Sequence, residues 1–222
     1  MQTVQLIKTG LLEYEKAWKL QKDLHKRCLQ NESADTLILT EHPHTYTIGR
    51  TGSERHLIAK ESALNERGIT VYRTDRGGDI TYHGPGQIVG YPIFNLHHFY
   101  LDVGRFLRDL EETLILMLAD FDLNAGRIPG LTGVWVEGAK IAAIGIKVSR
   151  WITMHGFALN VNTDLSYFGN IVPCGISDKP VTSMERLLNK KVDMNEVQQS
   201  LIAKMEGVFR IDFIQKSVVE SV

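Results

Sequence analysis

Hydrophobic residues recur every three to four positions in two long stretches of the chain, and this spacing is the period of an amphipathic helix. The first stretch, residues 11–30, predicts a helix with one mostly apolar stripe. The stripe consists of Leu11, Tyr14, Trp18, Gln21, Leu24 and Cys28. The second stretch, residues 102–121, predicts another helix. Because Cys28 belongs to the first stripe, we expect its side chain in the core.

Short runs rich in β-branched and aromatic residues, bounded by Gly, Pro or Asp, predict the strands. Four of them precede the second helix, at residues 36–40, 45–49, 69–74 and 87–94. Three more follow it closely, GVWVEG, AKIAAIGIKV and WITMHGFALNV, and they predict an antiparallel meander. The run FRIDFI near the end of the chain predicts a last strand.

Two capping boxes indicate where helices begin in the last part of the chain. Thr182 with Glu185, and Asp193 with Glu196, each place an N-cap residue three positions before an acidic side chain. The second box precedes the helical run NEVQQSLIAKMEGVF. Helices and strands follow no regular βαβ order, and no Ser- or Pro-rich linker interrupts them. We therefore expect an α/β fold of the α+β type, in one domain over residues 1–222.

Composition and charge exclude several classes of protein. The 222 residues are 43% hydrophobic and 23% charged, which is typical of a soluble globular domain. Cys28 and Cys174 are the only cysteines, so a disulfide framework is excluded and we expect a reducing cytoplasm. No export signal or long apolar run indicates a membrane. No basic run accompanies the net charge of -1, so nucleic acid is not an expected partner.

A glycine-rich segment, RGGDITYHGPGQ at residues 76–87, lies between two predicted strands. Its glycines let the backbone turn sharply and approach a ligand without side chains in the way. A glycine-rich hairpin with a surface histidine is the alternative interpretation. The segment matches neither GxGxxG nor GxxxxGKS/T, so it is not a nucleotide loop of either kind.

Cys174 lies in the loop sequence VPCGIS, outside any apolar stripe. A free cysteine is commonly a small buried hydrophobe, but this position makes Cys174 a candidate nucleophile. A reactive thiolate needs a nearby cation, histidine or helix N-terminus. Lys140, Lys147 and His155 are the candidates upstream of it.

The histidines offer base or metal chemistry, and neither is strongly indicated. His155 in MHGFALN could act as a base for the cysteine, as in papain-like enzymes, but no local protease signature is present. His42 with His44, and His97 with His98, have no carboxylate or cysteine at a metal-ligand spacing. We therefore interpret both pairs as ordinary loop histidines and expect no bound metal.

Strand periodicity separates the two lysines. In a regular strand over residues 140–148, successive side chains point to opposite faces. Lys140 then shares its face with Ala142, Ile144, Ile146 and Val148. A buried lysine is costly unless it is paired or functional, so Lys140 is functional unless it snorkels from the strand end. We expect Lys147, on the opposite face, to be a solvated charge.

Four ordered segments of the chain resemble the lipoyl(octanoyl) transferase family. They are RGGDITYHGPGQ at 76–87, KIAAIG at 140–145, HGFALNVNTDL at 155–165 and PCGISD at 173–178. The resemblance extends from about residue 41 to residue 188. It implies the fold of biotin and lipoate protein ligases, in which mixed β-sheets are flanked by helices.

The same resemblance implies roles for individual residues. Cys174 is expected to carry the acyl group, with Lys140 as its catalytic partner. The family motifs place further residues in the acyl-substrate site: Arg76, Gly77, Gly78, Asp79, Ile80, Thr81, Tyr82, His83, Ala143, Ile144, Gly145, Gly156, Phe157 and Ala158. No metal or other cofactor is implied.

The implied reaction moves an octanoyl group from octanoyl acyl carrier protein to Cys174 and then to a lysine of a lipoyl domain. These two proteins are therefore the expected partners. One alternative is an ATP-dependent lipoate or biotin protein ligase, which needs no nucleophilic cysteine. The other is a non-catalytic module that binds acylated or lipoyl proteins. Cys174 and Lys140 favour the transferase over both.

Overall fold

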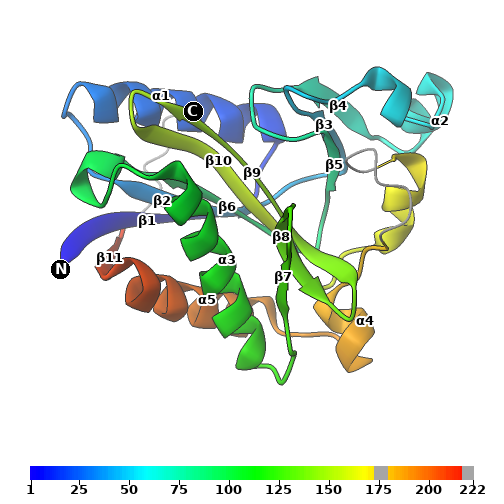
Figure 1. Ribbon diagram of the computed structural model, residues 1–222. Coiled ribbons are helices and arrows are strands. Elements are labelled where there is room, and N and C mark those ends of the chain that lie inside the picture. The colour runs from blue at the N-terminus through cyan, green and yellow to red at the C-terminus, as the bar shows by residue number, and fades with distance from the viewer. Residues whose placement is uncertain (173–179, 217–222) are drawn as a thin grey trace.

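The computed structural model describes residues 1–172 and 180–216 of the chain. In this part, eleven strands form one sheet of eight strands and one of three. Helices pack around the two sheets, as Figure 1 shows. The predicted combination of mixed sheets and flanking helices is therefore confirmed.

The large sheet has the strand order β11-β1-β2-β6-β10-β9-β8-β7. Its strands are β1 (Gln2–Leu11), β2 (Thr36–Glu41), β6 (Gln87–Ile93), β7 (Gly126–Ile128), β8 (Leu131–Val136), β9 (Ala139–Ser149), β10 (Ile152–Asn160) and β11 (Ile211–Gln215). β1 runs parallel to β2 and β11, whereas the other neighbouring strands are antiparallel. β8, β9 and β10 confirm the predicted meander.

The small sheet has the order β4-β3-β5. It consists of β3 (Thr45–Ile48), β4 (Thr70–Arg73) and β5 (Ile80–His83), with β3 parallel to β4 and antiparallel to β5. It has a core of its own, to which Leu64 of α2 (Glu61–Glu66) contributes. Tyr167 and Phe168 of the 3-10 helix η3 (Leu165–Asn170) pack against this core.

Helices cover both faces of the large sheet. α1 (Tyr14–Leu29) packs on one face, and α3 (Val103–Ala119) with α5 (Met194–Phe209) packs on the other. β2 shows this division, because Ile38 joins the core under α1 whereas Leu37 and Leu39 join the core under α3 and α5. The short α4 (Met184–Leu188) precedes α5. No helix in the described part of the chain is long and apolar enough to cross a membrane.

The first helix and the first strand differ from the sequence prediction. Leu11 ends β1 and is 61% exposed, so the buried stripe of α1 begins at Tyr14. β1 itself, β5 and the short β7 and α2 are absent from the prediction. β1 forms because two strands from distant parts of the chain, β2 and β11, hydrogen-bond to it on both sides. Local sequence does not carry that information.

One of the two predicted capping boxes is wrong. α4 is capped by Ser183, whose hydroxyl accepts the N–H of Arg186, and not by Thr182. The N–H of Thr182 donates instead to the carbonyl of Lys140 in β9. The cap of α5 is confirmed, because the Asp193 carboxylate accepts two backbone N–H groups of the first turn.

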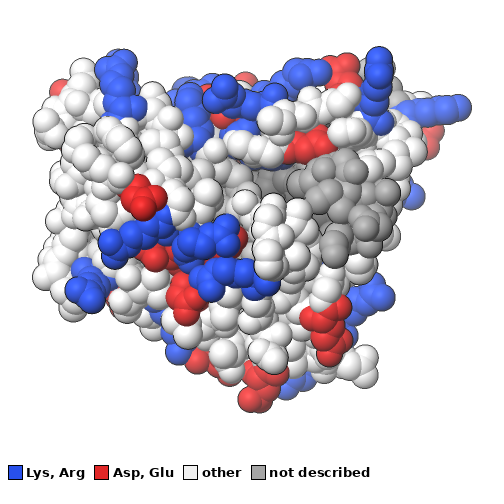
Figure 2. Space-filling view, viewed as in Figure 1, with Lys and Arg blue, Asp and Glu red and all other residues white. Residues whose placement is uncertain are grey.

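A buried carboxylate ties α3 to the β7–β8 hairpin. Glu111 is fully buried, forms ion pairs with Arg108 (2.7 Å) and Arg127 (3.0 Å), and accepts the N–H of Gly133 (3.0 Å). Figure 2 shows basic and acidic side chains side by side over α3. Because a buried carboxylate is costly unless it is fully paired, these bonds hold α3 and the hairpin together.

We predict that Glu111→Ala lowers the free energy of unfolding by about 1–3 kcal/mol, because the buried N–H of Gly133 loses its acceptor. Glu112→Ala is the matched control. The Glu112 side chain, which pairs with Arg127, is 41% exposed, so its removal should lower the free energy of unfolding by at most about 1 kcal/mol. Urea unfolding followed by circular dichroism measures both values. Equal losses in the two variants would contradict the assignment.

Candidate active site

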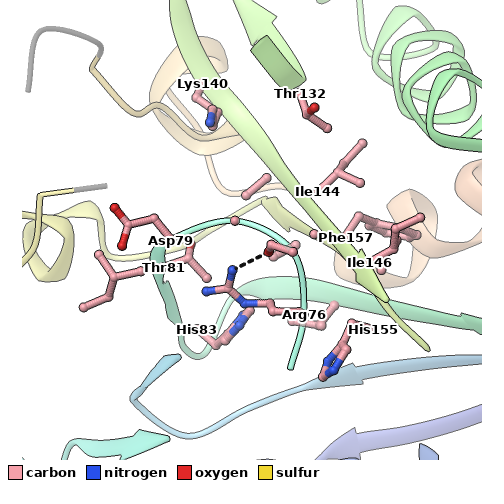
Figure 3. Close-up of a pocket in the computed structure, with 18 of the residues that line it drawn as sticks. Arg76, Asp79, Thr81, His83, Thr132, Lys140, Ile144, Ile146, His155 and Phe157 are labelled. Carbon is pink, nitrogen blue, oxygen red and sulfur yellow. Dashed lines mark hydrogen bonds between the residues drawn. The ribbon is translucent and has the colours of Figure 1, made fainter. Parts of the chain in front are cut away.

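A cavity of about 360 Å³ lies where the two sheets meet. Its walls come mainly from the loop at residues 76–79 and from β5, β6, β9 and β10, and most of the lining residues are apolar or glycine. The volume is typical of a small-molecule site. Figure 3 shows Lys140 and Asp79 on one side of the cavity, and Ile146 and Phe157 on the other.

The structure brings most of the predicted site residues together around this cavity. Those that line it are Arg76, Gly77, Gly78, Asp79, Ile80, Thr81, His83, Lys140, Ala143, Ile144, Gly145, Gly156, Phe157 and Ala158. Tyr82 is the exception, because it packs in the core of the small sheet with its hydroxyl 2.7 Å from Nδ1 of His44. Cys174 lies outside the described residues.

The loop at residues 76–79 connects the two sheets through backbone hydrogen bonds. On one side, the N–H of Gly77 donates to the carbonyl of Ile146 in β9, at 2.8 Å. On the other side, the carbonyl of Asp79 accepts the N–H of Gly49, which directly follows β3, at 3.0 Å. The loop therefore forms a wall of the cavity that is attached to both sheets.

Glycine is required where this loop approaches β9. A Cβ atom on Gly145 would lie 2.7 Å from the carbonyl oxygen of Gly77, which is closer than such contacts normally come. Gly78 has a φ of +84°, a conformation that other residues rarely adopt. β5 and β6 belong to different sheets, so the glycine-rich segment does not form the hairpin that was the alternative interpretation.

The guanidinium of Arg76 is buried against the small sheet. Its Nη2 donates to the carbonyl of Thr47 (2.6 Å), its Nε to the Thr47 hydroxyl (3.1 Å) and its Nη1 to the carbonyl of Gly77 (3.0 Å). An arginine does not lose its proton in a protein. This wall of the cavity therefore carries a fixed positive charge.

Two buried histidines near this wall are neutral. His83 bonds through Nδ1 to Oε1 of Gln87 (2.9 Å) and through Nε2 to the hydroxyl of Thr47 (3.3 Å), and its burial holds its pKa well below the usual range. His42 is fully buried beside the hydroxyl of Tyr91 (2.8 Å), and burial lowers its pKa to about 4. His42 does lie in the loop between β2 and β3, but its burial was not predicted.

Lys140 lines the cavity, but β9 is not the regular strand that the prediction assumed. The pairing with β8 shifts between Val134, opposite Ala142, and Trp135, opposite Lys140. Ile141 lies in this irregularity, so Ile141 and Ala142 are both buried in the main core instead of pointing to opposite faces. The ammonium of Lys140 lies 4.7 Å from the centre of the Trp135 ring.

Lys147 is paired rather than solvated, contrary to the prediction. Its ammonium lies 2.6 Å from the carboxylate of Asp75, which also accepts Nε2–H of His155 at 2.7 Å. These bonds, that from His155 first, hold the pKa of the Asp75 carboxyl well below its usual range. Burial lowers the pKa of the His155 imidazole, and this effect outweighs the opposite effect of the Asp75 carboxylate. His155 is thus a neutral partner of Asp75.

A second carboxylate–imidazole pair, of which Asp79 lines the cavity, was not predicted. Asp79 is buried, and its Oδ2 lies 2.5 Å from Nδ1 of His56, in the 3-10 helix η1 (Glu54–His56). Its Oδ1 accepts the N–H of Ser53 at 3.3 Å. The two residues are far apart in the sequence, and no local motif around His56 indicates that they meet.

Backbone hydrogen bonds hold the described residues on either side of 173–179. The N–H of Val172 donates to the carbonyl of His56, and the N–H of Lys140 donates to the carbonyl of Pro180, both at 2.8 Å. Val181, which follows, lines the cavity itself. The described residues next to this segment are thus bonded to His56 on one side and to Lys140 on the other.

Cys28 is a core residue, as predicted. It is buried under α1, and burial raises the pKa of its thiol to about 11. A thiol with such a pKa is a poor nucleophile. Among the residues that the structure describes, no three His, Cys, Asp or Glu side chains are grouped in a way that could hold a metal ion.

Comparison with known proteins identifies the family. Residues 13–206 match the family of lipoyl protein ligase A/B catalytic domains. The chain is 48% identical to the octanoyltransferase of Cytophaga hutchinsonii over 91% of each chain, and 48% identical to that of Solibacter usitatus over 92% of each. The chain therefore belongs to the lipoyl protein ligase A/B family and, within it, to the octanoyltransferases, which are acyltransferase enzymes.

Solved structures show the same fold at much lower sequence identity. A bi-partite lipoate protein ligase from Thermoplasma acidophilum has a TM-score of 0.79 at 18% identity, over 99% of this chain and 89% of that one. A biotin protein ligase from Aquifex aeolicus has a TM-score of 0.52 at 10% identity, over 95% and 70% of the two chains. The expected fold of lipoate and biotin ligases is thus confirmed.

We predict that Gly145→Ala displaces the loop at residues 76–79, because the added methyl group would overlap the Gly77 carbonyl. Overpacking of this kind costs about 1–3 kcal/mol, and the amide of Gly77 should exchange its hydrogen faster. Gly126→Ala is the control, since a Cβ there meets nothing within 4 Å. Hydrogen exchange and urea unfolding measure the effects. Unchanged exchange at Gly77 in the first variant would contradict the close approach.

Proposed function

We propose that the chain transfers an octanoyl group from octanoyl acyl carrier protein to a lysine of a lipoyl domain, through a thioester on Cys174. The main support is the cavity, whose largely apolar walls suit an alkyl chain. It is lined by Lys140, which is bonded to Pro180, the residue directly after the segment 173–179. The relatives at 48% identity are octanoyltransferases. We place the reaction in the cytoplasm, where carrier protein thioesters and reduced cysteines coexist.

The covalent reach of the chain supports Cys174 as the nucleophile. Cys174 follows Val172 by two residues, and two residues of extended chain span at most about 7 Å. Val172 is bonded to His56, whose partner Asp79 lines the cavity together with Lys140. Cys174 thus follows shortly after a residue that is bonded to the partner of a cavity-lining carboxylate, whereas the thiol of Cys28 is buried under α1.

The first step exchanges one thioester for another. The thiolate of Cys174 attacks the carbonyl carbon of the donor, the bond to the carrier sulfur breaks, and the carrier leaves as a thiol. Lys140 supplies the cation that favours the thiolate and the proton that the leaving sulfur takes up. Because a thioester is formed for each one that is broken, no nucleotide is needed to activate the acyl group.

The second step forms an amide. The neutral amine of the acceptor lysine attacks the thioester and gives up one proton to Lys140, which the first step left neutral. Cys174 leaves with its electron pair as a thiolate, so both groups return to their starting states. An amide is more stable than a thioester, so this step runs downhill. The cavity holds the alkyl chain in both steps, with Ile146 and Phe157 on the side away from Lys140.

The two alternative functions predict different behaviour. A ligase would need ATP, and one lipoate-protein ligase A with this fold has been solved with bound ATP. A binding module would hold acylated proteins without turnover. Transfer without nucleotide, combined with an acylated cysteine, distinguishes the proposed reaction from both.

We predict that octanoyl acyl carrier protein, with neither nucleotide nor metal added, leaves one hydroxylamine-sensitive octanoyl group on Cys174. Intact mass spectrometry and peptide mapping locate the group. Cys174→Ser should abolish it, whereas Cys28→Ser should acylate normally, because the Cys28 thiol is buried. An acyl group on Cys28 alone, or a strict requirement for ATP, would overturn the proposal.

We predict that Lys140→Ala slows acylation of Cys174 on the order of 10²-fold or more, because it removes the cation and the proton donor. Steady-state transfer rates and the pH dependence of Cys174 alkylation measure the two roles separately. Lys190→Ala is the control, since Lys190 is exposed beyond α4. Circular dichroism checks that both variants are folded, and equal activity of the two would remove Lys140 from the mechanism.

A further inference from the structure

Side chains at every second position of β6 line the cavity. They are Gln87, Val89 and Tyr91, and strand alternation places them on the same face of the large sheet. All three are almost fully buried although they line the cavity. By contrast, Gly130 and Thr132 at the β7–β8 hairpin also line the cavity but are exposed. This row of β6 side chains therefore belongs to the inner wall, away from the opening.

The strand register places the polar end of this row near Lys140. Gln87 pairs with Asn160 of β10, and the two side-chain amides are bonded at 2.9 Å. The Nδ2 group of Asn160 also donates to the carbonyl of Thr182, whose N–H donates to the carbonyl of Lys140. Tyr91 lies four residues further along β6, at the other end of the row. A chain that enters beside Lys140 therefore extends toward Tyr91.

The ring of Tyr91 is held in place by a buried histidine. The Tyr91 hydroxyl lies 2.8 Å from Nε2 of His42, and Nδ1 of His42 lies 2.6 Å from the carbonyl of Leu12. Because His42 is neutral, its Nδ1–H donates to this carbonyl and its Nε2 accepts the Tyr91 hydroxyl. The His42 ring also lies 5.2 Å, centre to centre, from the ring of Tyr14, which lines the cavity as well. Packed aromatic rings therefore close the inner end.

The length of the row matches an eight-carbon chain. Four residues of strand, from Gln87 to Tyr91, span about 13 Å. Contact between the end of a chain and the ring takes up about 4 Å of this length, the separation of two non-bonded carbon atoms. An extended octanoyl chain, with bonds of about 1.5 Å, is about 9 Å long, so it fills the remainder. A decanoyl chain is two methylene groups longer and would overlap the ring.

We propose that the ring of Tyr91 determines the length of the acyl chain that the enzyme transfers, because it closes the inner end of the cavity. The terminal methyl group of an octanoyl chain reaches the ring, and longer chains are excluded by it. The inference rests on the proposed function, in which the acyl carbonyl reacts beside Lys140 and the alkyl chain lies in the cavity. Tyr91 is then a specificity-determining residue for the reaction.

The middle of the row leaves space for the chain. Val89 lies opposite Ala158 of β10, which in turn lies opposite Ala143 of β9, and all three line the cavity. Two of these three side chains are single methyl groups, so the cavity is wider here than at Tyr91. A larger side chain at Ala158 should therefore shorten the space that the chain can use, whereas a smaller one at Tyr91 should lengthen it.

The test measures chain-length preference in one mixture. Hexanoyl, octanoyl and decanoyl acyl carrier proteins compete for the enzyme, and mass spectrometry of the lipoyl domain counts the three products. We expect the unmodified enzyme to favour octanoyl over decanoyl by about 10²-fold, since one methylene group in an apolar pocket changes selectivity by about 10–200-fold. Tyr91→Leu should raise the ratio of decanoyl to octanoyl product by about tenfold or more. Ala158→Val should raise the ratio of hexanoyl to octanoyl product.

Two further variants separate chain length from stability. Tyr91→Phe loses the bond to His42 but keeps the ring, so it should keep the preference for octanoyl. Ile93→Val is the matched control, because Ile93 is buried on the same face of β6 and is not among the described residues that line the cavity. Its product ratios should equal those of the unmodified enzyme. Because the donors compete for the same enzyme molecules, a loss of folded protein leaves every ratio unchanged.

Unchanged ratios in Tyr91→Leu, or the same shift in Tyr91→Phe or Ile93→Val, would overturn the proposal. Equal transfer of octanoyl and decanoyl groups by the unmodified enzyme would also overturn it. If the unmodified enzyme transfers no octanoyl group to the lipoyl domain, the proposed function fails first, and the two failures are therefore distinguishable.

Discussion

The cavity depends on the close approach of two backbones at Gly77 and Gly145. The loop at residues 76–79 can lie against β9 only because neither position carries a side chain there, and the N–H of Gly77 then reaches the carbonyl of Ile146. This contact joins the small sheet to the large one. Together with the bond from the Gln87 side chain in β6 to the carbonyl of Tyr82 in β5, it fixes the shape of the space between the sheets.

Buried polar groups stabilise this junction at a considerable cost in desolvation. Arg76 and Asp79 are buried, half-buried Asp75 precedes them, and each of the three is held by several hydrogen bonds. Charged groups in such positions are tolerated only when they are fully paired. Such a desolvation cost is expected at a site where charges must keep fixed positions during a reaction, because preorganised groups need not rearrange when the transition state forms.

The sequence predicts the elements far better than their long-range contacts. The meander, α3 and the cap of α5 follow from local patterns. The residues that the family motifs place in the site make up about half of the cavity wall, and they leave out the lining residues from α1, α3, β6 and β8. β1 could not be predicted because its pairing partners, β2 and β11, are distant in sequence. The ion pair of Lys147 and the partnership of His56 with Asp79 were missed for the same reason. The irregularity at Ile141 breaks the alternation of faces along β9 from which Lys140 was predicted to be functional. The family motif therefore predicts the place of Lys140 in the cavity wall better than strand periodicity does.

The separation of apolar and polar ends also suggests why a covalent route suits this cavity. Under the proposed reaction the carrier protein must leave before the lipoyl domain arrives, because both deliver their reacting groups to the same rim. A buried alkyl chain contributes about 0.8 kcal/mol for each methylene group, and this burial does not change when the carbonyl passes from one sulfur to another. The chain can therefore stay in place while the proteins exchange, and the thioester prevents its loss to water. A fixed cavity with reactive groups confined to its rim is what such an exchange requires.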